Sequence, residues 1–254
     1  MDPQENYIVI SMNCINENLD FEKIRAEYQS NNNFVVIRDF LQTETAEELH
    51  SYYHNIPEEW WSWMFLPDPD LGLENWKTNV YKNTDDPNTK NLINLKRKAV
   101  NKAFSENQGF SYIYRRVFYD SHYEECRCEE CVFQKDFLTQ KPMLSFLENL
   151  TGHENLTAGE LFASRLEKGD YNGPHNDIGK GRVTIVLSLT KNWLPQDGGV
   201  FFGMEEDYCT IKHVEVPTFN SLVVFDVSDG GMPHLVNHVE NHDKKRISIT
   251  GWYE

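Results

Sequence analysis

The last third of the chain contains a series of short apolar runs that constrain the fold more than any other feature. In a β-strand successive side chains point to opposite faces, so apolar residues at every second position mark one buried face. Such runs lie at residues 183–189, 200–202, 221–225 and 246–253, and turn residues such as Gly198-Gly199 separate them. Short strands between turns are typical of an antiparallel barrel or jelly roll. The sequence therefore predicts a mainly β fold with flanking helices.

A set of metal-ligand residues accompanies these predicted strands. His175 and Asp177 are two residues apart, so their side chains point to the same side of a strand while Asn176 faces away. A lone His234 follows in Met-Pro-His. Two imidazoles and one carboxylate leave three coordination positions open, which is the facial triad of non-haem Fe(II) oxygenases. A bare His-x-Asp pair is common by chance, and the predicted strands after it add weight to this interpretation.

Several motifs in this region resemble those of a known family. They are His175-Asn176-Asp177, Gly181-Arg182, Trp193 with Gly198-Gly199, Asn220 to Phe225, and Arg246 to Trp252. On these motifs the segment resembles the 2-oxoglutarate and Fe(II)-dependent dioxygenases, in particular their prolyl-hydroxylase-like branch and its Tpa-type ribosomal prolyl hydroxylases. The resemblance implies a double-stranded β-helix (jelly-roll) core over residues 156–254. Residues 1–155 would form a mixed α/β supporting region of one oxygenase domain spanning 1–254.

The resemblance also implies roles for individual residues. Fe(II) would be held by His175, Asp177 and His234. Arg246, whose distance from His234 matches the family, would bind the distal carboxylate of 2-oxoglutarate with its two-pronged guanidinium, and it completes the implied catalytic set. Ser248 lies on the same side of the predicted strand and would donate a further hydrogen bond. The same spacing favours His234 over two later histidines as the ligand.

A second contact to 2-oxoglutarate is less well defined by the sequence. Many members carry an aromatic residue just ahead of the glycine before the first ligand, whereas this chain has Leu-Glu-Lys-Gly at 166–169. Tyr171, or a tyrosine of the predicted strand 111–119, is expected to take that place. One of two sets on this strand faces the interior, either Tyr112, Tyr114 and Arg116 or Ile113, Arg115 and Val117.

The implied reaction is hydroxylation of a prolyl or other amino-acid side chain in a protein, with O₂ consumed and 2-oxoglutarate decarboxylated to succinate. Ascorbate is a further expected cofactor. One alternative is a hydroxylase of a free amino acid or small metabolite. Another is a non-catalytic barrel that binds metal or co-substrate, although a pure binding module has no need of the complete set of four residues. Hydroxylation of a protein and hydroxylation of a free amino acid or small metabolite both stay open, because substrate identity depends on loops.

Charge and hydropathy restrict the partners. The chain has 254 residues and a net charge of −16, from 40 acidic and 24 basic residues. This charge argues against a nucleic acid as the main partner, because phosphates would be repelled, and it favours a basic peptide or small cation. Solubility alone is an equally good explanation of the charge. No apolar run is long enough to span a bilayer, and residues 1–5 do not resemble a signal peptide, so we predict a cytoplasmic protein without membrane contact.

Three of the five cysteines form a compact cluster. Together with His122, the residues Cys126, Cys128 and Cys131 offer four ligands that a tetrahedral Zn²⁺ would accept. The spacing is tighter than in common zinc fingers. The cluster is therefore predicted to be either a structural zinc site or a group of free thiols.

Patterns upstream of the β region predict supporting elements. The predicted helices span 16–30, 46–55, 92–104 and 142–150, and the predicted strands span 34–37 and 111–119. Thr45 and Glu48 suggest a capping box at the start of the second helix. The aromatic-rich segment 57–65 is expected to fill the core.

Overall fold

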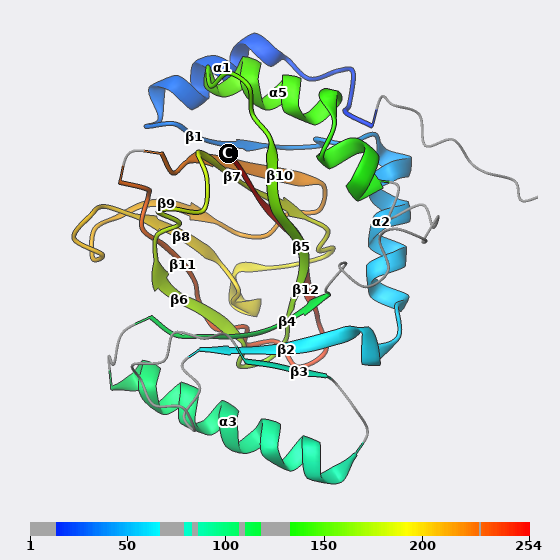
Figure 1. Cartoon of the computed structure of the whole chain (residues 1–254), viewed down its shortest axis with the longest axis vertical. Coiled ribbons are helices and arrows are strands. Elements are labelled where there is room, and N and C mark those ends of the chain that lie inside the picture. Colours follow the sequence, from blue (N-terminus) through cyan, green and yellow to red (C-terminus); the bar gives the residue numbers. More distant parts are fainter. Residues whose placement is uncertain (1–13, 67–78, 83–85, 107–109, 118–132, 229) are drawn as a thin grey trace, which may run out of the picture.

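The computed structural model describes residues 14–66, 79–82, 86–106, 110–117, 133–228 and 230–254. Within these residues the strands form one 12-stranded sheet, and every strand pair in it is antiparallel. Figure 1 shows the strands stacked at the centre of the molecule with helices on the outside. The prediction of a mainly β protein with a jelly-roll core is confirmed. The predicted domain limits stay a prediction.

The strands run from β1 to β12 in chain order. Their bounds are β1 (Phe34–Ile37), β2 (Trp61–Leu66), β3 (Asn79–Lys82), β4 (Tyr112–Val117), β5 (Ala158–Leu166), β6 (Tyr171–His175), β7 (Val183–Ser188), β8 (Phe201–Met204), β9 (Ile211–Glu215), β10 (Ser221–Asp226), β11 (His234–Val236) and β12 (Arg246–Tyr253). The order across the sheet is β1-β10-β7-β12-β5-β4-β6-β11-β8-β9, and β2 pairs with both β3 and β4. One cavity is lined by residues of β2, β4, β5, β6, β7, β8, β11 and β12.

Helices cover the outside of this sheet. Their bounds are α1 (Phe21–Ser30), α2 (Thr43–Asn55), α3 (Pro87–Ser105) and α5 (Lys141–Thr151), with short helical turns η1 (Glu58–Trp60), η2 (Phe133–Leu138) and η3 (Pro195–Asp197). Figure 1 shows α1 and α5 side by side beyond β1, α2 along one flank, and α3 beyond β2 and β3. Among the described residues, no helix has the length and apolar character needed to cross a membrane.

Helix ends follow local sequence signals in some places and tertiary contacts in others. The Asp20 side chain accepts a hydrogen bond from the backbone of Lys23 and caps α1, and Gly152 ends α5 in the left-handed conformation. The predicted capping box at Thr45 is wrong, because α2 already begins at Thr43. The reason is tertiary: the Gln42 N–H donates to the Cys14 carbonyl at 2.8 Å, which keeps the chain extended until residue 42.

Alternation along the central strands separates the core from the cavity. On β7, Val183, Ile185 and Leu187 are fully buried in the main hydrophobic cluster, whereas Thr184 and Val186 line a cavity on the other face. On β12, Ile247 and Ile249 join the same cluster, while Arg246, Ser248 and Thr250 line the cavity. Because of the period-two pattern, one face of each of these strands packs in the hydrophobic core and the other faces the cavity. The predicted core role of the aromatic segment is met in part: β2 is buried along its length, whereas Trp60 before it is 45 % exposed.

Candidate active site

The metal-ligand residues predicted from the sequence come together where β6 and β11 pair. His175 at the end of β6 lies directly opposite His234 at the start of β11. Asp177 follows two residues after His175 and is buried. Its carboxylate oxygens lie 3.6 Å from the His175 Nε2 and 3.7 Å from the His234 Nε2. One ligand atom from each residue lies within 4.8 Å of the other two, which allows them to share one ion.

Backbone contacts orient both imidazoles. The Nδ1 of His175 is 2.8 Å from the Gly173 carbonyl, and the Nδ1 of His234 is 2.9 Å from the Met232 carbonyl. A carbonyl can only accept, so each Nδ1 carries the proton and each Nε2 keeps its lone pair. Both lone pairs are therefore available for a metal, with the rings held in position by the chain itself.

The environment favours the ligating forms of the residues. Burial and the neighbouring His234 lower the pKa of His175 to about 4, so this imidazole is neutral at pH 7. Burial alone would raise the pKa of Asp177, but the two imidazoles and a hydrogen bond from Thr184 hold it below its usual value. The Thr184 hydroxyl donates to one Asp177 oxygen at 3.1 Å and is itself buried. Asp177 is thus an oriented carboxylate at neutral pH.

A buried arginine lies in the same cavity. Arg246 is only 6 % exposed, and burial lowers the pKa of its guanidinium to about 10, so it remains charged at pH 7. Its Nε is buried without a hydrogen-bond partner, and among the described residues no carboxylate forms an ion pair with it. A buried cation without a partner is costly, which makes this position a site for an anion from outside the chain.

Two serines lie beside Arg246 on neighbouring strands. Ser248 follows Arg246 by two residues on β12 and lies opposite Ser164 of β5, with their hydroxyl oxygens 3.0 Å apart. Both are buried and both line the cavity. Ser248 was predicted to serve the co-substrate. Ser164 was not, because no motif marks it and only the strand register places it there.

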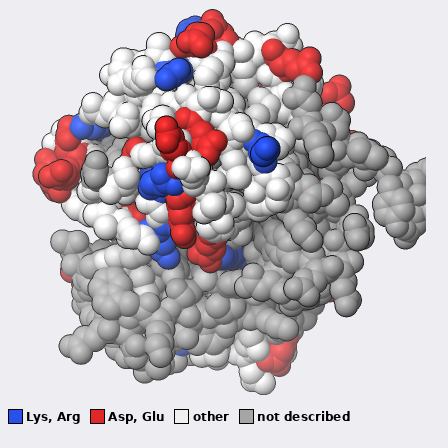
Figure 2. Space-filling model, turned by 45° about the horizontal axis from the view of Figure 1, so that its top comes forward, with Lys and Arg blue, Asp and Glu red and all other residues white. Residues whose placement is uncertain are grey.

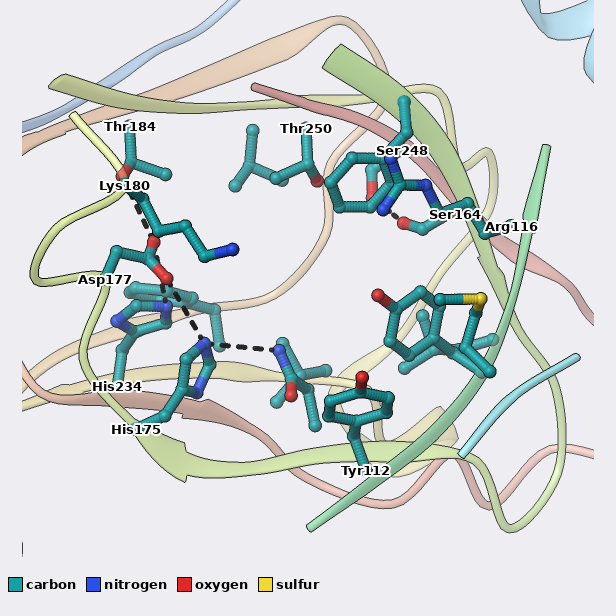
Figure 3. Close-up of a pocket in the computed structure, with 18 of the residues that line it drawn as sticks. Tyr112, Arg116, Ser164, His175, Asp177, Lys180, Thr184, His234, Ser248 and Thr250 are labelled. Carbon is teal, nitrogen blue, oxygen red and sulfur yellow. Dashed lines mark hydrogen bonds and ion pairs between the residues drawn. The ribbon is translucent and has the colours of Figure 1, made fainter. Parts of the chain in front are cut away.

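The triad and the serine pair face one cavity of about 520 Å³. Figure 3 shows His175, Asp177 and His234 gathered at one side, with Ser164, Ser248 and Arg116 across the space from them. Aromatic side chains form much of the wall. They are Phe110, Tyr112, Tyr114, Phe162, Phe201 and Trp252. Phe110 stacks on the His175 ring at 4.6 Å between centroids.

The outcome for the expected second co-substrate contact is mixed. Tyr171 does not reach the cavity: its hydroxyl donates to Ser111 at 3.0 Å, and its ring packs in a cluster with Ile93 and Val100 of α3. This assignment was therefore wrong. The reason is a bulge in β6, where three residues from Asn172 to His175 span the length of two on β11. The extra residue turns Tyr171 to the opposite face.

The alternative on β4 fits the geometry. Tyr112, Tyr114 and Arg116 line the cavity, so the first of the two predicted sets faces inward. The guanidinium of Arg116 pairs with Glu160 of β5 and lies 3.8 Å above the centroid of the Phe162 ring. No sequence motif marks Glu160, because its ion pair with Arg116 depends on the pairing of β4 with β5.

Other predicted residues lie apart from the cavity or outside the described residues. His238, one of the two later histidines, stacks on Tyr171 at 4.4 Å, and His242 contacts Lys168. Neither lines the cavity. The predicted zinc ligands His122, Cys126, Cys128 and Cys131 lie outside the described residues.

Comparison with known families agrees with this geometry. Residues 161–254, which contain the triad and Arg246, match the family model described as the 2OG-Fe(II) oxygenase superfamily. This region is a 2OG-Fe(II) oxygenase domain. The match lies in the part of the chain whose motifs predicted this resemblance.

One curated relative and two solved structures illustrate the relationship. The chain is 35 % identical over 88 residues to the prolyl 3,4-dihydroxylase OGFOD1 of Ostreococcus tauri, a match covering 31 % of this chain and 17 % of that protein. An oxidoreductase of the 2OG-Fe(II) oxygenase family from Burkholderia pseudomallei aligns with a TM-score of 0.58 at 14 % identity, covering 94 % and 92 % of the two chains. A prolyl-4-hydroxylase from Pseudomonas putida aligns with a TM-score of 0.51 at 14 % identity, covering 92 % and 98 %. At this identity the structures establish the fold only.

The side chains present fit the group that this superfamily binds. The triad supplies two nitrogen donors and one oxygen donor, the set that non-haem Fe(II) accepts. The buried Arg246 supplies the cation that a dicarboxylate needs. The triad is thus a candidate site for Fe(II), and Arg246 a candidate contact for 2-oxoglutarate.

Proposed function

We propose that this protein hydroxylates a prolyl side chain in a protein or peptide, with O₂ consumed and 2-oxoglutarate decarboxylated to succinate. The observation that carries the proposal is a single cavity with three metal ligands at one side and a buried, unpaired Arg246 on β12. The similarity to a prolyl dihydroxylase extends over 88 residues only. It supports the choice of substrate class.

The triad has a simple role in this reaction. The Nε2 atoms of His175 and His234 and a carboxylate oxygen of Asp177 would hold Fe(II), and the hydrogen bond from Thr184 would fix the carboxylate. When bound, iron and 2-oxoglutarate together supply the oxidation of a C–H bond by O₂. The protein contributes an oriented ligand set in a buried site, where competing reactions with water are suppressed.

Arg246 and the serine pair would bind the co-substrate. A guanidinium forms two parallel hydrogen bonds with a carboxylate, and burial strengthens them. In the Ser164–Ser248 pair one hydroxyl donates to the other, which leaves the second proton free for the same carboxylate. The carboxylate of the co-substrate would thus accept hydrogen bonds from the Arg246 guanidinium and from the serine proton that the pair leaves free.

The remaining wall suits a prolyl ring. Phe110 and Tyr112 lie next to the His175 side of the cavity, and Phe162 and Trp252 pack against each other with ring centroids 5.6 Å apart. Aromatic grooves are a common way to recognise prolyl segments, because the rigid ring loses little entropy on binding. These side chains are the expected contacts of the target residue.

Turnover assays with matched substrates test the proposal. We expect a peptide with one proline to stimulate succinate release and to gain the mass of one oxygen at that residue. The alternative, hydroxylation of a free amino acid, predicts that L-proline or L-lysine stimulates release and the peptide does not. A peptide of equal length without proline is the control. Release that no proline-containing substrate stimulates would contradict the proposal.

Two further predictions concern ascorbate and the location of the protein in the cell. Omission of ascorbate from the reaction tests whether it is needed for sustained turnover. The expected cytoplasmic location is tested separately, by imaging the tagged protein in cells.

A further inference from the structure

An exposed aromatic side chain is hydrogen-bonded to a residue that lines the cavity. Tyr208, between β8 and β9, is 42 % exposed, and its backbone has a φ of +57°, a conformation that bulky residues rarely adopt. Its hydroxyl accepts a hydrogen bond from the Asn176 side chain at 3.1 Å. Asn176 lies between two proposed iron ligands and lines the cavity. Strained residues of this kind concentrate at ligand-contact sites.

The turn that presents Tyr208 is well ordered by its own hydrogen bonds. The Asp207 carboxylate accepts from the backbone N–H groups of Cys209 and Thr210, both at 2.8 Å, and from the Thr210 hydroxyl at 2.7 Å. The Tyr208 N–H donates to the Glu205 carbonyl at 3.0 Å. A turn held in this way presents its aromatic ring at little entropic cost when a partner binds.

Two other loop residues extend this surface. Ile178, next to Asp177, is 57 % exposed. It lies against Gly231, where an added Cβ would be 3.3 Å from the Ile178 side chain and 3.5 Å from that of Asn176. We refer to Asn176, Ile178, Tyr208 and Gly231 as the rim. The rim presents two exposed hydrophobic side chains, Ile178 and Tyr208, and is continuous with the cavity wall at Asn176.

An acidic groove of about 500 Å³ adjoins the rim at Gly231. Its wall includes Glu205, Glu206 and Asp226, and Lys212 is the one lysine or arginine among the lining residues of the described chain. Lys212 pairs with Glu205 at 2.7 Å, while Glu206 forms no ion pair with any described residue. Asp226 lies 2.7 Å from the His153 Nε2, so Glu206 is the carboxylate of the groove that lacks a partner among the described residues. Three carboxylates against one lysine leave the groove negative. Figure 2 likewise shows more acidic than basic surface on the described part of its face.

We propose that the rim and the acidic groove bind the polypeptide substrate beside its target residue, and that the preferred substrate carries lysine or arginine there. The inference rests on the proposed function. The rim supplies apolar contact area next to the iron ligands, and the groove supplies the complementary charge. Lys180 lines the cavity, and its Nζ lies 5.3 Å from the centroid of the Trp252 ring.

Peptide binding tests this surface directly. The probes are two labelled peptides of equal length with one central proline, flanked on both sides by lysines in one and by glutamates in the other. Binding is measured by fluorescence anisotropy with Fe(II) and 2-oxoglutarate under nitrogen. We expect the lysine peptide to bind about tenfold more tightly, and the preference to shrink as salt is raised.

Substitutions then locate the surface. Tyr208→Ala should weaken lysine-peptide binding about fivefold, Tyr208→Phe should largely preserve it, and Glu206→Lys should remove the preference between the peptides. The matched control is Leu95→Ala, because Leu95 is 56 % exposed on α3 and should not change binding. Circular dichroism and Mn(II) binding, measured for the Tyr208 and Glu206 variants beside the wild type, check that the fold and the triad are intact.

Three results would overturn the inference: equal affinity for the two peptides, binding that the Tyr208 and Glu206 substitutions leave unchanged, or no binding of either peptide. Mass spectrometry of the same peptides separates this inference from the proposed function. If the lysine peptide binds as expected but its proline gains no oxygen, prolyl hydroxylation is refuted and the docking surface stands. If both prolines are hydroxylated with equal affinity, the docking surface is refuted alone.

Discussion

The two parts of the cavity that would hold iron and co-substrate differ in the charge of the ligand that each one suits. At the triad, two imidazole nitrogens and a carboxylate oxygen lie within 4.8 Å of one another, a donor set that suits a cation. At Arg246, a buried guanidinium has no carboxylate among the described residues. The first needs a positive charge and the second a negative one. A molecule that chelates a metal through one end and presents a carboxylate at the other satisfies both needs.

The difference also concerns how each part is held. The triad is braced by backbone carbonyls and by Thr184, so its geometry exists before any ligand binds. The guanidinium of Arg246 has no such bracing, although its Cδ packs closely over Gly199, where an added Cβ would be 2.9 Å away. We infer that the triad is preorganised, whereas the Arg246 side is completed by its ligand.

The largest expected effect comes from removing the carboxylate of the triad. Asp177→Ala should reduce 2-oxoglutarate turnover at least about 100-fold, because changes to residues that merely support a metal ligand already cost 10- to 100-fold. The measurement is succinate release, with circular dichroism as the control for folding. A folded Asp177→Ala variant with full turnover would refute the triad.

Loss of the unpaired cation should act on the other side of the cavity. Arg246→Gln should weaken 2-oxoglutarate binding about 30-fold or more, since removing one partner of a buried charge pair costs roughly 2 kcal/mol or more. Arg246→Lys should recover only part, because it lacks the fork. Without ligand, the Gln variant should melt at a higher temperature than the wild type, because a buried unpaired charge is gone. A lower melting temperature would show that Arg246 has a structural partner.

The hydrogen bond from Thr184 to Asp177 can be tested without measuring turnover. Thr184→Val keeps the shape but loses the hydroxyl, and it should weaken Mn(II) binding, measured by calorimetry, about tenfold. Thr184→Ser retains a hydroxyl and should restore most of the affinity. Equal affinities for the three proteins would mean that Asp177 is oriented by packing alone.

The smallest expected effect is a pH dependence of the metal-free protein. The pKa of His175 is about 4 in the fold against an ordinary value of 6.5, so the unfolded chain takes up this proton first as pH falls. The stability contribution is therefore complete above pH 6.5 and is lost as pH falls towards 4, by on the order of 1 kcal/mol. Urea unfolding in chelator measures it. His175→Gln should flatten this part of the profile, and an unchanged profile would contradict the assignment.

Local pattern was sufficient for much of the fold. The strand predicted at 34–37 is β1, and the alternation at 183–189 became β7, with its apolar positions towards the helices. The spacing of His175 and Asp177 also predicted correctly that both face one cavity. These inferences succeed because side-chain direction in a regular strand depends on local geometry alone.

Register and irregularity limited what could be foreseen. Ser164 and Glu160 line the cavity because β5 pairs with β12 and β4, partners that are distant in sequence. Tyr171 was misplaced because one extra residue in β6 reverses the alternation. Tyr208 reaches Asn176 only through the turn between β8 and β9.

The sequence by itself determined the β pattern and placed His175 and Asp177 on one side of the chain, because both depend on residue type and short spacing. The resemblance to a known family added His234 and Arg246 to this predicted set. The tertiary structure alone decided which other residues lie in or beside the cavity. Strand pairing chose Ser164, the bulge excluded Tyr171, and the loop contacts of Gly231 and Tyr208 built the rim. Those choices rest on contacts between segments far apart in the chain, and no local preference encodes them.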